Sequence, residues 1–231
     1  MVLKDISFPT LAENVAFDEI LFQLADKQGQ EEYLRFWESP VYGVVLGRIS
    51  KMEEDVRLAS TETDGIAVLR RSSGGGTVLQ GPGCLNFTLV LCKQKRPVLN
   101  DLHASYEWIL TQVAETLRPL GIEAVFHPIS DLALAENARK FSGNAQRRGK
   151  THILHHGTIL YKFSLDFISR YLTMPKETPV YRKGRSHNEF VANIPIAPQV
   201  FKPALAARLG VLGPPQDPTP EEIAFLKNYL K

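Results

Sequence analysis

A glycine-rich stretch, residues 70–86, carries the residue types best suited to holding an anion. It reads Arg-Arg-Ser-Ser-Gly-Gly-Gly-Thr-Val-Leu-Gln-Gly-Pro-Gly-Cys-Leu-Asn, so two arginines and two hydroxyls precede three consecutive glycines. Adjacent glycines carry a high entropy cost and are tolerated where backbone turns sharply or approaches a ligand closely. Bare amides beside arginines form a concavity that suits a phosphate or carboxylate. The stretch therefore predicts an anion-binding loop, with a glycine-rich hairpin and two solvated arginines as the alternative.

A second segment, Arg-Lys-Phe-Ser-Gly-Asn-Ala at residues 139–145, places a lysine beside small polar residues. In a strand, Lys140 and Ser142 share one face, and Gly143 lets a ligand approach the backbone. A lysine in this setting can stabilise a phosphate or a developing oxyanion. The alternative is a solvated lysine on an edge strand, because lysine side chains usually lie at the surface.

Histidines follow at positions 152, 155 and 156. Neighbouring residues of a strand point to opposite faces, so His155 and His156 are poorly placed to chelate one metal ion. The sequence contains neither an HExxH pattern nor a G-x-S-x-G elbow, which argues against a zinc hydrolase and a serine hydrolase. Residues 143–151 imitate a P-loop, but five residues separate the glycines and β-forming residues follow where a helix is required.

Hydrophobic periodicity predicts the elements that position these segments. Helices are expected over residues 11–28, 52–60, 101–117 and 165–172, with Asp101 as an N-cap. Strands are expected over residues 31–38, 41–47, 65–70, 85–91, 123–127, 131–134, 139–146 and 151–161. Many strands joined by hairpin-like links, with helices at intervals, predict a mixed α+β domain with a mainly antiparallel sheet flanked by helices.

The last part of the chain changes character, because prolines punctuate two short helical patterns near residues 200–209 and 221–230. We expect one domain over residues 1–195 and a short proline-rich helical extension over residues 196–231. The stretch over 174–188 is expected to be irregular and cationic.

Bulk composition excludes several classes of protein. The net charge of +2 is too balanced for the dense basic face of a nucleic-acid-binding protein. The chain has two cysteines, Cys84 and Cys92, and no CxxC spacing, which is typical of a reducing compartment. The first residues lack the apolar core of a signal peptide, and no apolar run approaches the ~20 residues of a membrane span. We therefore expect a cytoplasmic protein that binds neither nucleic acid nor membrane.

Taken together, three segments resemble the lipoate–protein ligase family of the biotin/lipoate ligase superfamily. They are Arg70-Arg71-x-Ser-Gly-Gly-Gly, Lys140-x-Ser-Gly-Asn-Ala and His155-His156-Gly157-Thr158-x-Leu160, in this order and at these separations. The combination is far more specific than a glycine-rich loop alone, and it covers roughly residues 10–195. The resemblance implies the fold of class II aminoacyl-tRNA synthetases and biotin ligases.

The resemblance also implies a role for individual residues. Lys140 is the expected catalytic residue, which holds the carbonyl and phosphate oxygens of an acyl-adenylate, and Asp131 is expected to help place magnesium or the phosphates. His156 and Gly157 are expected to lie against the acyl chain or carbonyl, and Trp37 to form the acyl tunnel with apolar residues of the first helix. The other residues expected to line the site, with the backbone of 77–79 meeting the adenine, are Arg70, Ser72, Gly74, Gly75, Gly76, Thr77, Val78, Leu79, Gly83, Asn86, Ser142, Gly143, Asn144, Ala145 and Thr158.

The implied chemistry joins lipoate or octanoate to AMP with ATP and magnesium, then passes the acyl group to a lysine of a lipoyl domain or a glycine-cleavage carrier protein. Related octanoyl- and lipoyl-transferases use a cysteine thiolate instead, for which Cys84 is the conceivable candidate and Cys92 a more inert core thiol. A binder of lipoyl domains or acyl-adenylate without catalysis is the third alternative.

Two departures from the family pattern bear on this choice. Gln80 stands where many members have histidine, and residues 196–231 are too short for the accessory domain of bacterial two-domain ligases, so a separate accessory protein is conceivable. A cationic patch lies at residues 179–187 and includes Arg182 and Arg185. It is expected to cover the site or to receive the phosphates or an acidic lipoyl domain, and a solvated loop is the alternative.

Overall fold

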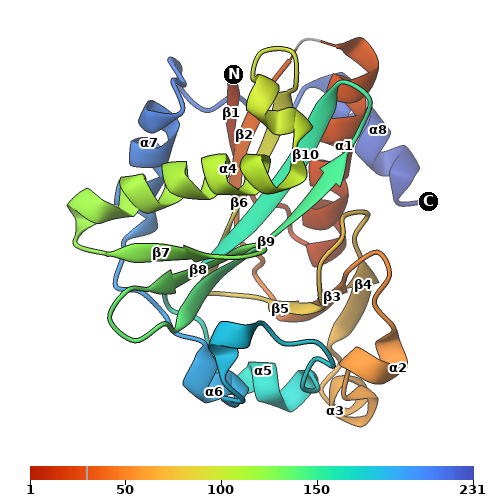
Figure 1. The fold of residues 1–231 in the computed structure, drawn as a ribbon. Coiled ribbons are helices and arrows are strands. Elements are labelled where there is room, and N and C mark those ends of the chain that lie inside the picture. Colours follow the sequence, from red (N-terminus) through yellow and green to blue (C-terminus); the bar gives the residue numbers. More distant parts are fainter. Residues whose placement is uncertain (30) are drawn as a thin grey trace.

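The computed structural model describes residues 1–29 and 31–231, and the strands of these residues form a seven-stranded sheet and a small three-stranded sheet (Figure 1). In the large sheet β1 pairs with β2 in parallel and all other pairings are antiparallel. The predicted mixed α+β fold with a mainly antiparallel sheet is confirmed. In spatial order the strands are β1 (Val2–Asp5), β2 (Tyr33–Trp37), β6 (Cys84–Cys92), β10 (His152–Leu160), β9 (Lys140–Arg148), β8 (Asp131–Leu134) and β7 (Ala124–His127).

Helices cover both faces of the large sheet, which is why the central strand β6 is buried along its whole length. On one face α4 (Leu102–Leu117) packs with Leu89 and Leu91, and the Asp101 side chain caps it by accepting from the Ala104 amide. On the other face α1 (Leu11–Gln28) packs against Val90. The predicted helices over 11–28 and 101–117 are therefore confirmed to within a residue or two.

The small sheet holds the glycine-rich stretch beside the large one (Figure 1). Its strand order is β4 (Ala67–Arg70), β3 (Gly43–Leu46) and β5 (Val78–Gln80), with β3 parallel to β4 and antiparallel to β5. The chain from β4 to β5 therefore crosses over β3, and this crossing is the glycine loop, residues 71–77.

The helix predicted over residues 52–60 is divided in two, α2 (Met52–Asp55) and α3 (Leu58–Thr63). Val56 interrupts it because its side chain is buried and its backbone forms an antiparallel bridge with Leu172. After α5 (Asp166–Tyr171), the stretch expected to be irregular contains a 3-10 turn, Val180–Arg182, and leads into α6 (His187–Phe190). Two further 3-10 turns are Pro97–Asn100 and Arg118–Leu120.

The last two helices, α7 (Pro198–Arg208) and α8 (Pro220–Tyr229), pack on the rest of the chain. Phe201 and Leu205 of α7 belong to the main core under α4, and α8 lies beside α1, where Leu226 is buried. The ammonium of Lys4 lies 2.9 Å from a carboxylate oxygen of Glu222, and both side chains are buried. The boundary at residue 195 stays a prediction. Within the described residues, no helix combines the length and hydropathy needed to cross a membrane.

Candidate functional site

The glycine loop is organised by the buried guanidinium of Arg71. Its Nη2 donates to the carbonyls of Gly74 and Gly76 at 2.7 and 2.8 Å, and its Nε donates to Ser73 Oγ at 3.0 Å. Burial lowers the pKa of Arg71 to about 10, so the group remains a cation at neutral pH. Arg71 was quoted in the sequence motif but not among the expected site residues; the structure gives it the role of holding the loop carbonyls on one side.

The three consecutive glycines are not equivalent. Gly75 has φ +80°, and a Cβ there would lie 3.1 Å from Arg71 Nη2, so the fold itself requires glycine. A Cβ on Gly74 or Gly76 would meet no described atom within 4 Å, and neither residue has a positive φ. The absence of a side chain at these two positions leaves room for a ligand to approach the backbone.

The loop lies over β9, close to Lys140. The amide of Gly74 donates to the Gln146 carbonyl at 3.3 Å, and a Cβ on Gly75 would lie 3.5 Å from Ala145 Cβ. Lys140 Nζ lies 2.7 Å from Asp131 Oδ1 and 3.0 Å from the position of a Cβ on Gly143. Gly143 therefore provides the space in which the lysine amine lies. Along β9, Gly143 is two residues from Ala145, the residue on which the loop packs.

Asp131 is shared between Lys140 and the cationic segment. The Tyr181 hydroxyl donates to Asp131 Oδ2 at 2.8 Å, and the Tyr181 ring stacks on His127 with centroids 3.9 Å apart. Burial, together with the Asp131 carboxylate, raises the pKa of Tyr181, so the hydroxyl stays protonated as the donor. Tyr181 was not among the expected site residues.

The two neighbouring histidines face opposite ways, as the strand alternation predicts. His155 is buried with Phe87 and Tyr106, and burial lowers its pKa to about 3. His156 points to the side covered by α1, where Nε2 lies 2.6 Å from Ser73 Oγ and Nδ1 lies 3.8 Å from Asp18 Oδ2. Thus Ser73, and not Ser72, is the hydroxyl that contacts His156.

Asp18 is a buried carboxylate that could not be singled out from sequence, because it lies within the apolar pattern of α1. It accepts from Arg35 Nη1 at 2.6 Å, Thr88 Oγ1 at 2.8 Å and Trp37 Nε1 at 3.1 Å. Burial opposes ionisation, but Arg35, His156 and Thr88 outweigh it and hold the pKa of Asp18 below its usual value. Trp37, expected in the acyl tunnel, is itself buried and helps to hold this carboxylate.

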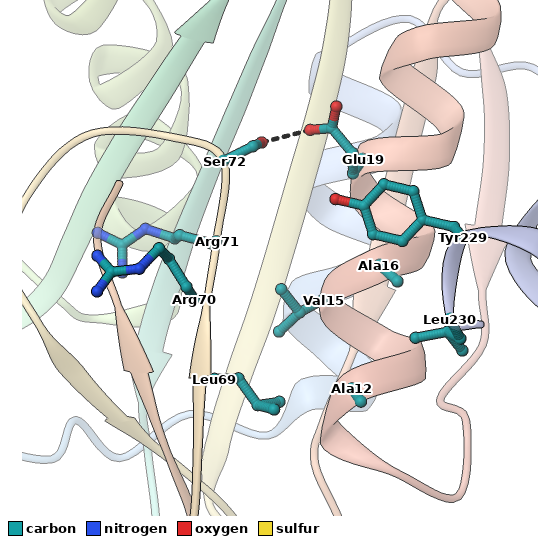
Figure 2. A pocket seen from close by; sticks show the side chains of 10 residues that line it. All are labelled: Ala12, Val15, Ala16, Glu19, Leu69, Arg70, Arg71, Ser72, Tyr229 and Leu230. Carbon is teal, nitrogen blue, oxygen red and sulfur yellow. Dashed lines mark hydrogen bonds between the residues drawn. The ribbon is translucent and has the colours of Figure 1, made fainter. Parts of the chain in front are cut away.

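Ser72 contacts a different acidic residue and lines a cavity (Figure 2). Its hydroxyl donates to Glu19, which also pairs with Arg147. The cavity, of about 140 Å³, lies between α1, the start of the glycine loop and the last turn of α8. Its size is similar to that of the ~150 Å³ apolar cavity that holds a benzene molecule in another protein. The residues that line it are Ala12, Val15, Ala16, Glu19, Leu69, Arg70, Arg71, Ser72, Tyr229 and Leu230.

The residues on which a thiol mechanism would depend form a closed network. The Gln80 and Asn86 amides bond each other at 2.9 and 3.0 Å, and Cys84 Sγ donates to Gln80 Oε1 at 3.3 Å. All three side chains are buried, and burial raises the pKa of the Cys84 thiol. Neither a solvent-accessible thiolate nor a proton-transfer group at position 80 is present.

Several other expected residues have structural partners. Arg70 Nη1 donates to the Gly47 and Ser50 carbonyls, both at 2.7 Å. Arg185 donates to four carbonyls, including those of Asn137 and Ala138, and Arg182 is buried over the Phe190 ring. Arg185 thus holds the cationic segment against the turn before β9, whereas Arg182 bonds within the segment and packs on α6.

Further expected residues lie in or beside the strands. A Cβ on Gly157 would lie 1.8 Å from Asn144 Oδ1, and one on Gly83 would lie 2.2 Å from the Lys162 backbone. The Asn144 amide donates to Ser142 Oγ at 3.1 Å. Thr158 Oγ1 contacts the Gly143 backbone, and the Thr77 hydroxyl donates to Asp55. Val78 and Leu79 lie on β5.

Magnesium binds in many enzymes through one or two carboxylates together with substrate phosphates. Asp131 offers one carboxylate, and the described residues contain no group of three or more histidine, cysteine or acidic side chains that could hold a metal ion. The residues present therefore fit a metal shared with bound phosphates and not a cage made by protein alone.

Comparison with known proteins agrees with this geometry. The family model described as the lipoyl protein ligase A/B catalytic domain matches residues 10–206. A probable lipoate-protein ligase A from Mycoplasma pneumoniae is 30% identical over 181 residues, which are 78% of this chain and 51% of that protein. The chain likewise spans about half the length, 52%, of the lipoate-protein ligase of Bacillus subtilis.

Two solved structures share the fold. The crystal structure of a lipoate-protein ligase A bound with ATP superposes with a TM-score of 0.82 at 24% identity, over 98% of this chain and 92% of that one. A bi-partite lipoate protein ligase from Thermoplasma acidophilum, described with its E2 lipoyl domain, gives 0.78 at 23% identity, over 98% and 90%. Because the family model spans both the glycine loop and the Lys140 segment, the chain belongs to the lipoyl protein ligase A/B catalytic domain family.

Proposed function

We propose that this chain activates lipoate or octanoate with ATP to form the acyl-adenylate and transfers the acyl group to a lysine of a lipoyl-domain protein. The observation that carries the proposal is the position of the Lys140 amine. It lies over Gly143 of β9, and the glycine loop, which has two open glycine positions, packs on Ala145, two residues further along the same strand. A cation close to a stretch of backbone that no side chain covers suits an anionic reaction centre.

In the first step the carboxylate of the acid attacks the α-phosphate of ATP and pyrophosphate leaves. Negative charge builds on groups that are already anionic, so a fixed cation stabilises the transition state without reorganisation. Lys140 would release Asp131 Oδ1 and donate to the α-phosphate and the acyl oxygen. Magnesium bound with the phosphates would neutralise part of their charge, with Asp131 as the carboxylate that holds it.

In the second step the amine of the acceptor lysine attacks the carbonyl of the mixed anhydride, and AMP leaves. Lys140 would stabilise the developing oxyanion, and the loop would hold the adenylate in place, so that much of the rate comes from positioning.

A thiol-based transferase has less support, because Cys84 is buried and hydrogen-bonded to Gln80, and burial raises the pKa of its thiol. A binder without catalysis has less support than the ligase, because the Lys140–Asp131 pair is intact.

Two partners follow from the proposal. One is the acceptor, a lipoyl domain or a glycine-cleavage carrier protein. The other is a separate accessory protein, suggested by the bi-partite ligase of Thermoplasma acidophilum.

The test is acyl transfer to an apo lipoyl domain, with ATP, magnesium and lipoate or octanoate, followed by intact-protein mass spectrometry. We expect a mass increase that requires ATP, and a loss of about 100-fold or more in Lys140→Ala, since a preorganised charge contributes at least that much. Lys227→Ala, an exposed lysine on α8, is the control and should be active. Transfer from an octanoyl carrier protein without ATP would refute the ligase, and binding without any transfer would favour the non-catalytic alternative.

A further inference from the structure

Three polar side chains from distant parts of the chain contact one another in succession at the glycine loop. Asp18 comes from α1, His156 from β10 and Ser73 from the loop. The contacts are 3.8 Å between Asp18 Oδ2 and His156 Nδ1, and 2.6 Å between His156 Nε2 and Ser73 Oγ. This order of carboxylate, imidazole and hydroxyl can carry a proton from the hydroxyl to the imidazole.

The surrounding donors determine the direction of the hydrogen bonds. Arg71 Nε donates to Ser73 Oγ at 3.0 Å, and the Ser73 carbonyl accepts from the Arg48 amide at 2.9 Å, so the serine is fixed at both ends. Asp18 faces His156 Nδ1 as a carboxylate, which favours the tautomer with its proton on Nδ1. His156 Nε2 is then the acceptor, and the Ser73 hydroxyl donates to it.

Two ion pairs and one further cation, Arg71, lie near His156. Asp18 is paired with Arg35 of β2, and Arg71 donates to the Ser73 hydroxyl that contacts His156. The neighbouring His155 is neutral because burial lowers its pKa to about 3. Glu19 of α1 and Arg147 of β9 pair with each other next to Ser72. Asp18 is thus the carboxylate that would stabilise an imidazolium at His156, whose side chain keeps 18% of its surface exposed.

Ser73, the last of these three side chains, lies on the loop that packs close to the proposed reaction centre. A Cβ on Gly75 would lie 3.5 Å from Ala145 Cβ, and the Lys140 amine lies at Gly143. Two residues of a strand span about 7 Å, so Lys140 and the loop that carries Ser73 flank the same short stretch of β9.

We propose that Ser73 and His156, supported by Asp18, take up the proton released when the acceptor lysine attacks the acyl-adenylate. This inference rests on the proposed function. The amine nitrogen forms a bond to the acyl carbon, and the bond between that carbon and the phosphate oxygen breaks, with its electron pair leaving on AMP. The proton of the attacking nitrogen passes to Ser73 Oγ while the hydrogen of Ser73 passes to His156 Nε2. Ser73 is buried in this structure, with 1% of its surface exposed, so the proposal requires the glycine loop to open when the acyl-adenylate binds, which brings Ser73 into contact with the substrate. His156 and Asp18 are positioning residues that act through it.

The experiment measures the second step alone, by mixing synthetic lipoyl-AMP with enzyme and an apo lipoyl domain and following a single turnover by mass spectrometry. Ser73→Ala and His156→Gln should each slow transfer by about 100-fold, in line with the usual contribution of proton-transfer groups. The loss should fall on the maximal single-turnover rate and not on the concentration of lipoyl domain that gives half of that rate, because neither side chain is proposed to bind the acceptor. His103→Gln, an exposed histidine on α4, is the matched control and should keep both wild-type values.

Binding of lipoyl-AMP and the melting temperature of each variant separate proton transfer from loss of structure or affinity. A folded variant that binds lipoyl-AMP but keeps the wild-type maximal rate, or that loses only affinity for the acceptor, would overturn the relay. Should one variant fail to fold, the other is sufficient for the test. If the wild-type protein transfers nothing from lipoyl-AMP above the uncatalysed blank and forms none from ATP and lipoate, the proposed function fails. If it transfers while the variants are unaffected, only the relay fails.

Discussion

The glycine loop allows a sharp test of which residues serve the fold and which serve the ligand. We predict that alanine at Gly75 destabilises the protein, whereas alanine at Gly74 or Gly76 leaves stability unchanged and weakens binding of the acyl-adenylate. The three substitutions add the same methyl group within three consecutive positions, so their different outcomes report local geometry only.

The magnitudes follow from the surroundings of each Cα. At Gly75 the φ of +80° costs about 1–2 kcal/mol for a residue with a side chain. The added Cβ would also lie 3.1 Å from Arg71 Nη2, which holds two loop carbonyls. Loss of one such charged hydrogen bond adds about 1.5–3 kcal/mol, so we expect about 2.5–5 kcal/mol in total. At Gly74 and Gly76 the Cβ meets no described atom within 4 Å, and the expected change is within about 0.5 kcal/mol.

Stability is measured by urea unfolding, followed by the fluorescence of the two tryptophans. Affinity is measured by calorimetric titration with a non-reactive acyl-adenylate analogue. An extra methyl group against a bound ligand costs about 1–3 kcal/mol, so affinity should fall by about fivefold or more in Gly74→Ala and Gly76→Ala. Gly213→Ala is the control, since its Cβ also meets no described atom within 4 Å and it lies outside the loop.

Two results would refute this reasoning. One is destabilisation of Gly74→Ala by more than about 1 kcal/mol relative to Gly213→Ala, which would mean that the loop needs glycine there for its own conformation. The other is unchanged affinity in both Gly74→Ala and Gly76→Ala, which would mean that the open positions do not face the ligand.

Cys84→Ala should retain ATP-dependent acyl transfer and lower the free energy of unfolding by about 1 kcal/mol, because the buried thiol only packs and bonds Gln80; loss of transfer in the folded variant would contradict this. His155 should make stability fall at acid pH, because its pKa is about 3 in the folded protein and about 6.5 when unfolded. Between these values the unfolded chain binds one more proton, so unfolding free energy falls by about 1.4 kcal/mol for each pH unit below 6.5. Urea titrations at several pH values should show this slope reduced in His155→Phe, and an unaltered slope would disprove the assignment.

Local sequence was sufficient to predict most of the elements. The helix capped by Asp101 and the strand over 131–134 were predicted because periodicity and capping involve neighbouring residues only. Strand alternation alone also predicted that His155 and His156 face opposite sides. The division of the helix over 52–60 was not predictable, because it depends on a bridge from Val56 to Leu172, far along the chain.

The sequence by itself determined the family, because the glycine-rich, Lys140 and His155–Thr158 segments are recognisable in their order and spacing. Only the tertiary structure decided which side chain in each segment contacts residues of the other segments. It distinguished Ser73 from Ser72 and Gly75 from its neighbours, put Gln80, Cys84 and Asn86 in the core, and brought Asp18 to His156. Such choices depend on packing between residues far apart in the chain, and neither composition nor spacing records that packing.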